Sequence, residues 1–147
     1  MAAWDDALEH HVARMLRIDL DEVEINPGPP GWWRVGTLPV PVVVRIDCDD
    51  RRLIRIHAEA LQGVKRTYRL LRELNDHNTF LDHVRTWWDD QSVFVGAELF
   101  IASIEPDELG EVVSAVARTA AVLSDLLPVV LGQAKPAEQA NLLFPND

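Results

Sequence analysis

The stretch Val64–Phe80, VKRTYRLLRELNDHNTF, decides how the rest of the chain is arranged. Its apolar residues recur at helical spacing and predict one buried stripe: Val64, Tyr68, Leu71 and Leu74. We expect the helix to end on the polar run 75–78, because Asn and Asp tolerate left-handed geometry and bond to their own backbone. Strand-like sequence lies on both sides, so this helix connects two parts of one sheet.

Composition limits the classes of protein. The 147 residues include 48% hydrophobic and 26% charged residues, which is the balance of a globular chain with a buried core. The net charge of −10 argues against nucleic acid or an anionic membrane surface as a partner. The first residues are acidic rather than basic, and no apolar run approaches a membrane span. We therefore expect a cytoplasmic protein, and the single Cys48 excludes an intrachain disulfide.

Strand patterns precede the central helix. A helix is expected over residues 3–16 and a short strand over Asp21–Ile25, followed by a rigid Pro- and Gly-rich loop over 26–31. Three strands come next and form an antiparallel meander: Trp32–Thr37, Pro41–Asp47 and Arg52–Ala58. Apolar residues alternate along them, so one face of the sheet is predicted to be buried.

The pattern after the central helix is a hairpin and a long helix. Phe80–Trp88 and Ser92–Ala102 are the predicted strands, joined at residues 89–91. The last helix begins near Pro106, and Pro128 ends or kinks it. Its predicted core seam repeats at steps of four and three: Leu109, Val113, Val116, Ala120, Leu123 and Leu127.

The predicted order is α-β-β-β-α-β-β-α, an α+β fold in which helices pack on one face of an antiparallel sheet. Residues 1–133 are expected to form a single domain that unfolds cooperatively. Residues 134–147 form a tail that is either loose or docks its Leu142-Leu143-Phe144 cluster on a neighbour. Leu71→Ala and Val116→Ala are each expected to cost roughly 2–4 kcal/mol, because each would leave a cavity.

Three segments carry a family resemblance: HAEALQGVKRTYRLLRELNDHNTF (57–80), VFVGAELF (93–100) and PDELGEVVSAVARTAAVLSDLLP (106–128). With them, the chain resembles the YbjN-like and Tir-chaperone-like (type III secretion chaperone) group over Trp32–Gln133, above all its actinobacterial peptide-binding chaperones. The most specific element is the junction Leu74-Asn75-x-x-Asn78 followed by a strand. The resemblance implies a small, usually dimeric protein that binds extended segments of partner polypeptides and performs no chemistry. Some members of the group are labelled only as regulators.

The residues themselves point to no enzyme, cofactor or metal. The Pro-Gly run at 27–31 lacks the lysine and the following helix of a phosphate-binding loop. His10 and His11 are adjacent, so on a helix they diverge and cannot share a metal. His57 and His83 are interpreted as half-exposed strand positions, and Cys48 stands among acids that disfavour its thiolate.

Two adjacent tryptophan pairs, Trp32-Trp33 and Trp87-Trp88, point to a partner surface. Successive strand side chains face opposite ways, so helices on one face can bury only one member of each pair. The others lie at partly covered edges or mark an interface. The predicted contact residues for a bound segment are Trp33, Trp87, Phe94 and Phe100, with Glu98 as a polar contact among them.

Three functional hypotheses follow. The first is a non-enzymatic module that binds extended, apolar or basic segments of partner proteins, and the second is a dimeric structural or regulatory protein without a client. The third is an enzyme or small-ligand binder whose site is assembled from distant residues. A homodimer is predicted through the Val64–Asn78 helix and the Phe80–Trp88 strand. Asn75 and Asn78 either bind a ligand or satisfy backbone groups at the helix end.

Overall fold

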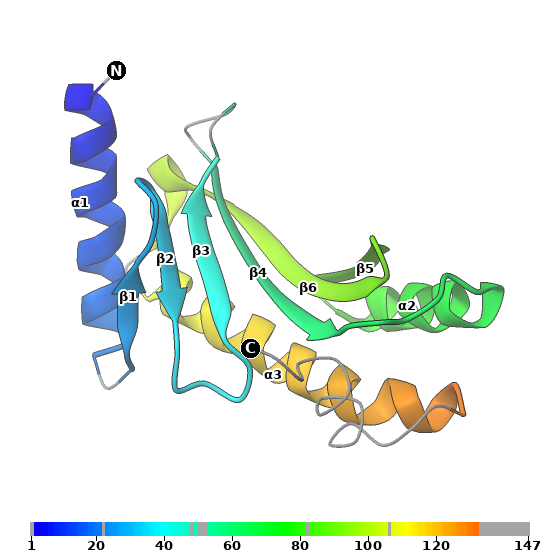
Figure 1. The fold of residues 1–147 in the computed structure, drawn as a ribbon. Coiled ribbons are helices and arrows are strands. Elements are labelled where there is room, and N and C mark those ends of the chain that lie inside the picture. Colours follow the sequence, from blue (N-terminus) through cyan, green and yellow to red (C-terminus); the bar gives the residue numbers. More distant parts are fainter. Residues whose placement is uncertain are drawn as a thin grey trace.

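The computed structural model describes residues 2–21, 23–47, 49, 53–81, 83–105 and 107–132, without the side chains of residues 2–5 (Figure 1). The predictions made for Cys48, for Pro106 and for the tail 134–147 lie outside these residues. The helices and strands in chain order are α1 (Ala2–Asp19), β1 (Ile25–Pro27), β2 (Trp32–Val35), β3 (Val42–Ile46), β4 (Leu53–Leu61), α2 (Tyr68–Phe80), β5 (Arg85–Asp89), β6 (Ser92–Phe100), the short 3₁₀ helix η1 (Ile101–Ser103) and α3 (Glu108–Val130).

The described strands form one antiparallel sheet in the order β1-β2-β3-β4-β6-β5. Strand β6 lies between β4 and β5, so β5 is the edge strand. Helix α2 therefore carries the chain from the end of β4 past β6 to this edge. The β5–β6 hairpin closes through Asp90 and Gln91, which both have positive φ, as two-residue hairpin turns require. The α+β fold is thus confirmed.

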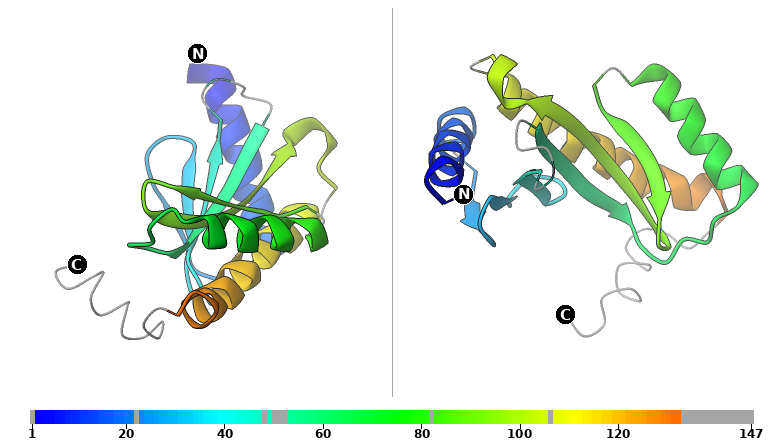
Figure 2. Two further views of the ribbon diagram at one scale, coloured as in Figure 1. Left: turned by 90° about the vertical axis from the view of Figure 1, so that its right-hand side faces the viewer. Right: turned by 90° about the horizontal axis from the view of Figure 1, so that it is seen from above.

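All three helices cover the same face of the sheet. In β4, Ile54, Ile56 and Ala58 are buried and alternate with half-buried residues, and α3 packs on β3, β4 and β6. Helix α2 bonds to Thr86, whose strand partner Val95 belongs to the same buried set. Helix α1 contributes Leu16 to the same core, which also includes Trp33 of β2, near the opposite edge of the sheet from α2. Figures 1 and 2 show α3 crossing the strands while α1 and α2 lie at opposite ends.

Helix α3 supplies the longest row of core side chains. Every residue of the predicted seam is buried: Leu109, Val113, Val116, Ala120, Leu123 and Leu127. The helix continues past Pro128 to Val130, and Gly132 then adopts φ +71° in the left-handed region that commonly ends helices. By length and composition α3 is apolar enough to cross a membrane. Its buried seam on the sheet is the arrangement of a core helix.

The predicted stripe of the central helix is wrong in two positions. Helix α2 begins at Tyr68 because the side chain of Thr67 caps it, accepting a bond from the Leu70 amide at 3.1 Å. Its buried residues are Leu70 and Leu74, whereas Tyr68 is 80% exposed and Leu71 42% exposed. Val64 is buried, but it lies in the extended connection before the helix.

Two predicted boundaries also differ. The helix does not stop on the polar run 75–78 but continues to Phe80, so β5 begins at Arg85 rather than at Phe80. The first strand is Ile25–Pro27 instead of Asp21–Ile25, and it takes in two residues of the predicted loop. Pro27 is compatible with a strand here because β1 is an edge strand with β2 as its only partner among the described strands.

Adjacent leucines on α2 provide a test of this packing. Leu70→Ala should lower the free energy of unfolding by about 2–5 kcal/mol, because a fully buried side chain would leave a cavity. Leu71→Ala should cost less than about 1 kcal/mol, since its side chain is partly in solvent. Urea unfolding in dilute solution, where association does not contribute, measures both. Equal losses would contradict the observed register of α2.

Candidate partner-binding surfaces

One face of the sheet carries no helix among the described residues, and we call it the open face. Its side chains are those that alternate away from the core. In β2–β6 they are Trp32, Arg34, Val43, Arg45, Leu53, Arg55, His57, Glu59, Arg85, Trp87, Phe94, Gly96, Glu98 and Phe100. Figure 1 views the sheet from this side, with α3 passing behind β2 and β3.

The structure divides each tryptophan pair between the two faces. Trp32 is 39% exposed on the open face, while Trp33 is 8% exposed and belongs to the core. Trp87 is exposed, and the partly buried Trp88 packs on the core and donates from Nε1 to the Val64 carbonyl at 2.7 Å. The predicted division is confirmed, but Trp33 was assigned to the wrong face. Trp32 is the member that reaches the open face.

Trp87 and Phe94 form an aromatic stack on the open face. Their ring centroids lie 5.7 Å apart with an interplanar angle of 21°. The Trp87 ring lies over Gly96, where a Cβ atom would come within 2.7 Å of the ring and 2.7 Å of the Ile56 carbonyl oxygen. Gly96 is therefore the residue that lets the indole lie flat against the sheet. The stack is a rigid apolar platform beside the β5 edge.

The other predicted contact residues lie farther along β6. Phe100 is exposed and faces Leu53 near the far end of that strand, so the structure does not bring it into the Trp87–Phe94 stack. Glu98 accepts a bond from Arg55 Nη1 at 2.6 Å, and Arg55 Nε also donates to Asp47. The bond to Asp47 raises the pKa of Arg55 above its ordinary value. Glu98 is therefore an exposed carboxylate that already has a cationic partner.

A hollow of about 800 Å³ lies on the open face between these groups. Its lining combines arginine, histidine and aromatic side chains with Glu98 as its acid: Arg45, Arg55, Ile56, His57, His83, Arg85, Trp87, Gly96, Ala97 and Glu98. Burial, and secondarily the charge of Arg45, lowers the pKa of His57 below its ordinary value of 6.5. The imidazole is thus neutral near pH 7 and sits in a locally positive field.

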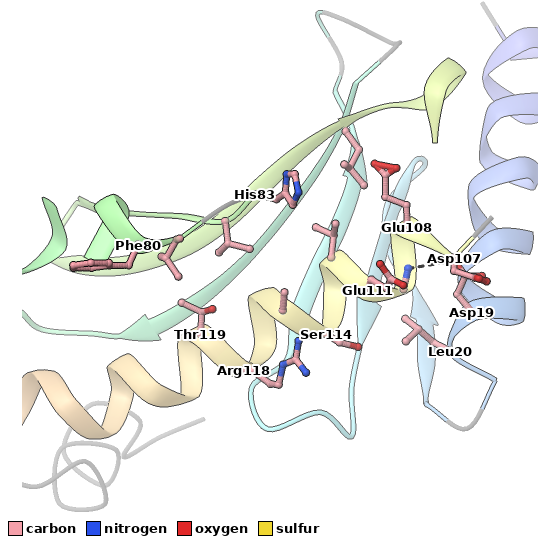
Figure 3. A pocket seen from close by; sticks show the side chains of 16 residues that line it. Asp19, Leu20, Phe80, His83, Asp107, Glu108, Glu111, Ser114, Arg118 and Thr119 are labelled. Carbon is pink, nitrogen blue, oxygen red and sulfur yellow. Dashed lines mark hydrogen bonds between the residues drawn. The ribbon is translucent and has the colours of Figure 1, made fainter. Parts of the chain in front are cut away.

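A second hollow, of about 790 Å³, lies between α3 and the segment that joins α2 to β5 (Figure 3). One end is apolar around Phe80, and the other carries the acids Asp19, Asp107, Glu108 and Glu111. Sequence reasoning missed this groove, because its walls come from α1, α2, β6 and α3, and the separate segments carry no signal of their meeting.

The acidic end of the groove is held by a contact between α1 and α3. Asp19 Oδ2 accepts a bond from the Gly110 amide at 3.2 Å. A Cβ at Gly110 would lie 2.7 Å from the Asp19 Cβ, so glycine permits this close approach of the two helices. Burial raises the pKa of Asp19, and nearby Asp107 adds to this effect, while the Gly110 bond opposes it. This contact therefore holds α1 against α3 at the acidic end of the groove.

Asn78 acts as a clamp between α2 and β5. Its Oδ1 accepts from the Thr86 amide at 2.8 Å and from the Thr86 hydroxyl at 3.0 Å, and its Nδ2 donates to the Thr86 carbonyl at 3.0 Å. The Thr86 hydroxyl also lies 3.3 Å from the Leu74 carbonyl. Asn78 thus satisfies backbone groups, which was one of the two interpretations of this residue. These groups belong to β5, however, and not to the end of the helix. Asn75 is exposed.

The described residues offer little for metal or acid–base chemistry. No group of three His, Cys, Asp or Glu side chains in the described part of the chain is placed to hold a metal ion. His10 Nδ1 lies 2.8 Å from the Asp6 carbonyl one turn earlier on α1, a local helix contact. Both hollows are lined by side chains suited to holding a polypeptide by hydrogen bonds and apolar contact, and only the arginine-lined hollow of the open face also suits an anion.

The described helices pack on one face of an antiparallel sheet, and aromatic side chains lie on the other face. This α+β arrangement is the type III secretion chaperone fold. The chain belongs to the TY-Chap1 family, described as T3SS (YopN, CesT) and YbjN peptide-binding chaperone 1, whose model matches residues 6–135. The family resemblance carried by the sequence is thereby confirmed. Among curated proteins, none matches the sequence of this chain.

Two solved structures share the fold. One is the crystal structure of the ExsC–ExsE complex, with a TM-score of 0.57 and 14% identity over 82% of this chain and 96% of that chain. The other is the Yersinia pestis type III secretion chaperone SycH in complex with a stable fragment of YscM2, with a TM-score of 0.57 and 18% identity over 81% of this chain and 98% of that chain. At these identities the likeness concerns the fold.

The two asparagines of the junction allow a matched test of the clamp. Asn78→Ala should lower the free energy of unfolding by about 1–3 kcal/mol, because it leaves the polar groups of the buried Thr86 without their Asn78 partner. Asn75→Ala should change it by no more than about 0.5 kcal/mol, since that side chain is exposed. Chemical denaturation compares the variants, and a larger loss for Asn75→Ala would refute the assignment.

Proposed function

We propose that the protein is a non-enzymatic chaperone that binds extended segments of partner proteins on the open face. The observation that carries this proposal is the Trp87–Phe94 stack, held flat on a sheet face that no described helix covers. Large aromatic side chains contribute much contact area at low entropic cost and dominate binding hot spots. An exposed platform of this kind would be a liability in a chain without a partner.

Membership of a peptide-binding chaperone family supports the same proposal. The two proteins of similar fold were each solved with a protein partner, ExsE in one case and a fragment of YscM2 in the other. By analogy, a polypeptide is the class of ligand we propose for this chain. A cytoplasmic location, and no role for nucleic acid or membrane, go with this proposal.

The proposed contact residues are those of the open face. Trp87 and Phe94 form its apolar centre, and Trp32 takes the place first given to Trp33, which is buried. Phe100 and Glu98 extend the surface along β6. Phe94 and Phe100 are six residues apart on β6, which is about 20 Å along the strand, so an extended segment of about six residues is needed to reach from the stack to Phe100.

We also propose a homodimer, formed through α2 and the segment that leads into β5. Tyr68 and Phe80 are 80% and 86% exposed, and Leu71 is partly exposed on the same helix. These groups lie on a different surface from the open face, so dimerisation and segment binding are separable. The second candidate function, a dimeric regulator without a client, rests on this α2 surface alone.

Segment binding is tested with three fluorescein-labelled 12-residue peptides that repeat Leu-Ser-X-Ser, where X is Asp, Asn or Lys. Trp87→Ala or Phe94→Ala should reduce the binding free energy of the best-bound peptide by roughly 1–3 kcal/mol, because each removes half of the aromatic stack. Fluorescence anisotropy measures this binding. Tyr68→Ala is the matched control and should leave binding unchanged, because this exposed aromatic side chain of α2 lines neither hollow. Absence of binding by all three peptides to the unaltered protein would reject the chaperone proposal.

The dimer is tested by sedimentation. Phe80→Ala should shift the protein towards monomer, because a highly exposed aromatic side chain on α2 would lose its buried contact in the dimer. Trp87→Ala should leave the sedimentation of the dimer unchanged and serves as the reciprocal control. An unaltered protein that sediments as a monomer at high micromolar concentration would remove the dimer from the proposal.

A further inference from the structure

Arginine is concentrated on the open face of a protein whose net charge is −10. Four arginines lie there on four strands: Arg34 on β2, Arg45 on β3, Arg55 on β4 and Arg85 on β5. The strand register places Arg45 opposite Arg55, and Arg55 opposite Glu98. A second row runs from Arg34 through Val43, His57 and Gly96 to Arg85. The two rows bring the arginines onto one surface although they are distant in sequence.

Only one of these arginines is neutralised within the described residues. Arg55 pairs with Asp47 and Glu98. In the described part of the chain, Arg34, Arg45 and Arg85 form no ion pair with any acid. The Arg45 guanidinium instead lies over the Trp32 ring, 5.3 Å from the centroid, and its donors form no hydrogen bond within the described part of the chain. Arg45 and Arg85 both line the hollow beside the Trp87 ring.

The spacing of Arg85 and Trp87 matches an extended segment. One residue separates Arg85 from Trp87 on β5, so their side chains lie on the same face, about 6.6 Å apart along the strand. In an extended ligand, residues i and i+2 have the same separation and also share a face. A segment with an apolar side chain on the Trp87–Phe94 stack therefore places the side chain two residues away beside Arg85.

We infer that the open face binds extended segments in which an apolar residue and an aspartate or glutamate alternate at i and i+2. The apolar side chain rests on the Trp87–Phe94 stack, and carboxylates accept hydrogen bonds from Arg45 and Arg85. Guanidinium groups bind carboxylates in a bidentate manner, and complementary charge sets specificity and register. The inference rests on the proposed function and replaces the expected preference for basic segments by a preference for acidic ones.

The three Leu-Ser-X-Ser peptides test this inference directly. The Asp peptide should bind about tenfold more tightly than the nearly isosteric Asn peptide, because a hydrogen bond to a charged group is stronger than one between neutral groups. The Lys peptide should bind most weakly. Raising the salt concentration should reduce the difference between the Asp and Asn peptides, since these charges are partly exposed.

Substitutions locate the effect. Arg45→Gln and Arg85→Gln should each reduce the advantage of the Asp peptide and leave the Asn peptide nearly unaffected. Arg17→Gln is the matched control, because it removes the same charge from an exposed position of α1 that lines neither the open-face hollow nor the groove beside α3. Circular dichroism melting verifies that each variant is folded.

The outcomes separate the two proposals. If the peptides bind equally well, or the Lys peptide binds best, the acidic preference is overturned while the chaperone proposal stands. If none binds, both fail. A change of sedimentation in Arg45→Gln or Arg85→Gln would show that a second copy of the chain occupies the face and would overturn the inference. Tighter binding of a peptide with the sequence of residues 133–147 would assign the face to this chain's own C-terminal segment and overturn it as well.

Discussion

The alternation of side chains along a β-strand, combined with the packing of the described helices on one face, is the constraint on which the rest of this structure depends. Every strand residue that faces α3 is committed to the core, and its neighbours are committed to the open face. Adjacent tryptophans must therefore lie on opposite faces of the sheet, with Trp33 in the core and Trp32 on the open face. The same constraint gathers arginines from four strands on one surface.

The sequence predicts most of this fold because strands and α3 each carry a single clear period. The seam of α3 and the alternation in β3, β4 and β6 predict that each of these elements buries one side. Helix α2 is different, because Leu70, Leu71 and Leu74 belong to two overlapping stripes. The Thr67 cap and the inward clamp of Asn78 select the stripe through Leu70 and Leu74. The cap is local to the helix, but the Asn78 clamp depends on where β5 lies, which is a tertiary fact.

The candidate site is less predictable than the fold. Alternation predicts that one tryptophan of each pair is exposed, but which member is exposed depends on the face that the helices choose. Glu98 stands out in the sequence as an acid within an apolar strand, yet its partner Arg55 lies 43 residues away and is brought opposite by register. The arginines of β2, β3 and β5 carry no local signal, since each is a single charge in a strand.

Arginine also limits the apolar surface that the open face presents to water. Its aliphatic stem covers apolar surface, and its planar guanidinium stacks on an aromatic ring, as Arg45 does on Trp32, while keeping its donors available. Lysine would shield such a ring less well and would hold its own water more strongly. A face kept soluble in this way still carries positive charge within an acidic protein. Under the acidic-segment inference, the feature that protects the surface against indiscriminate apolar contact would also select its partners by charge.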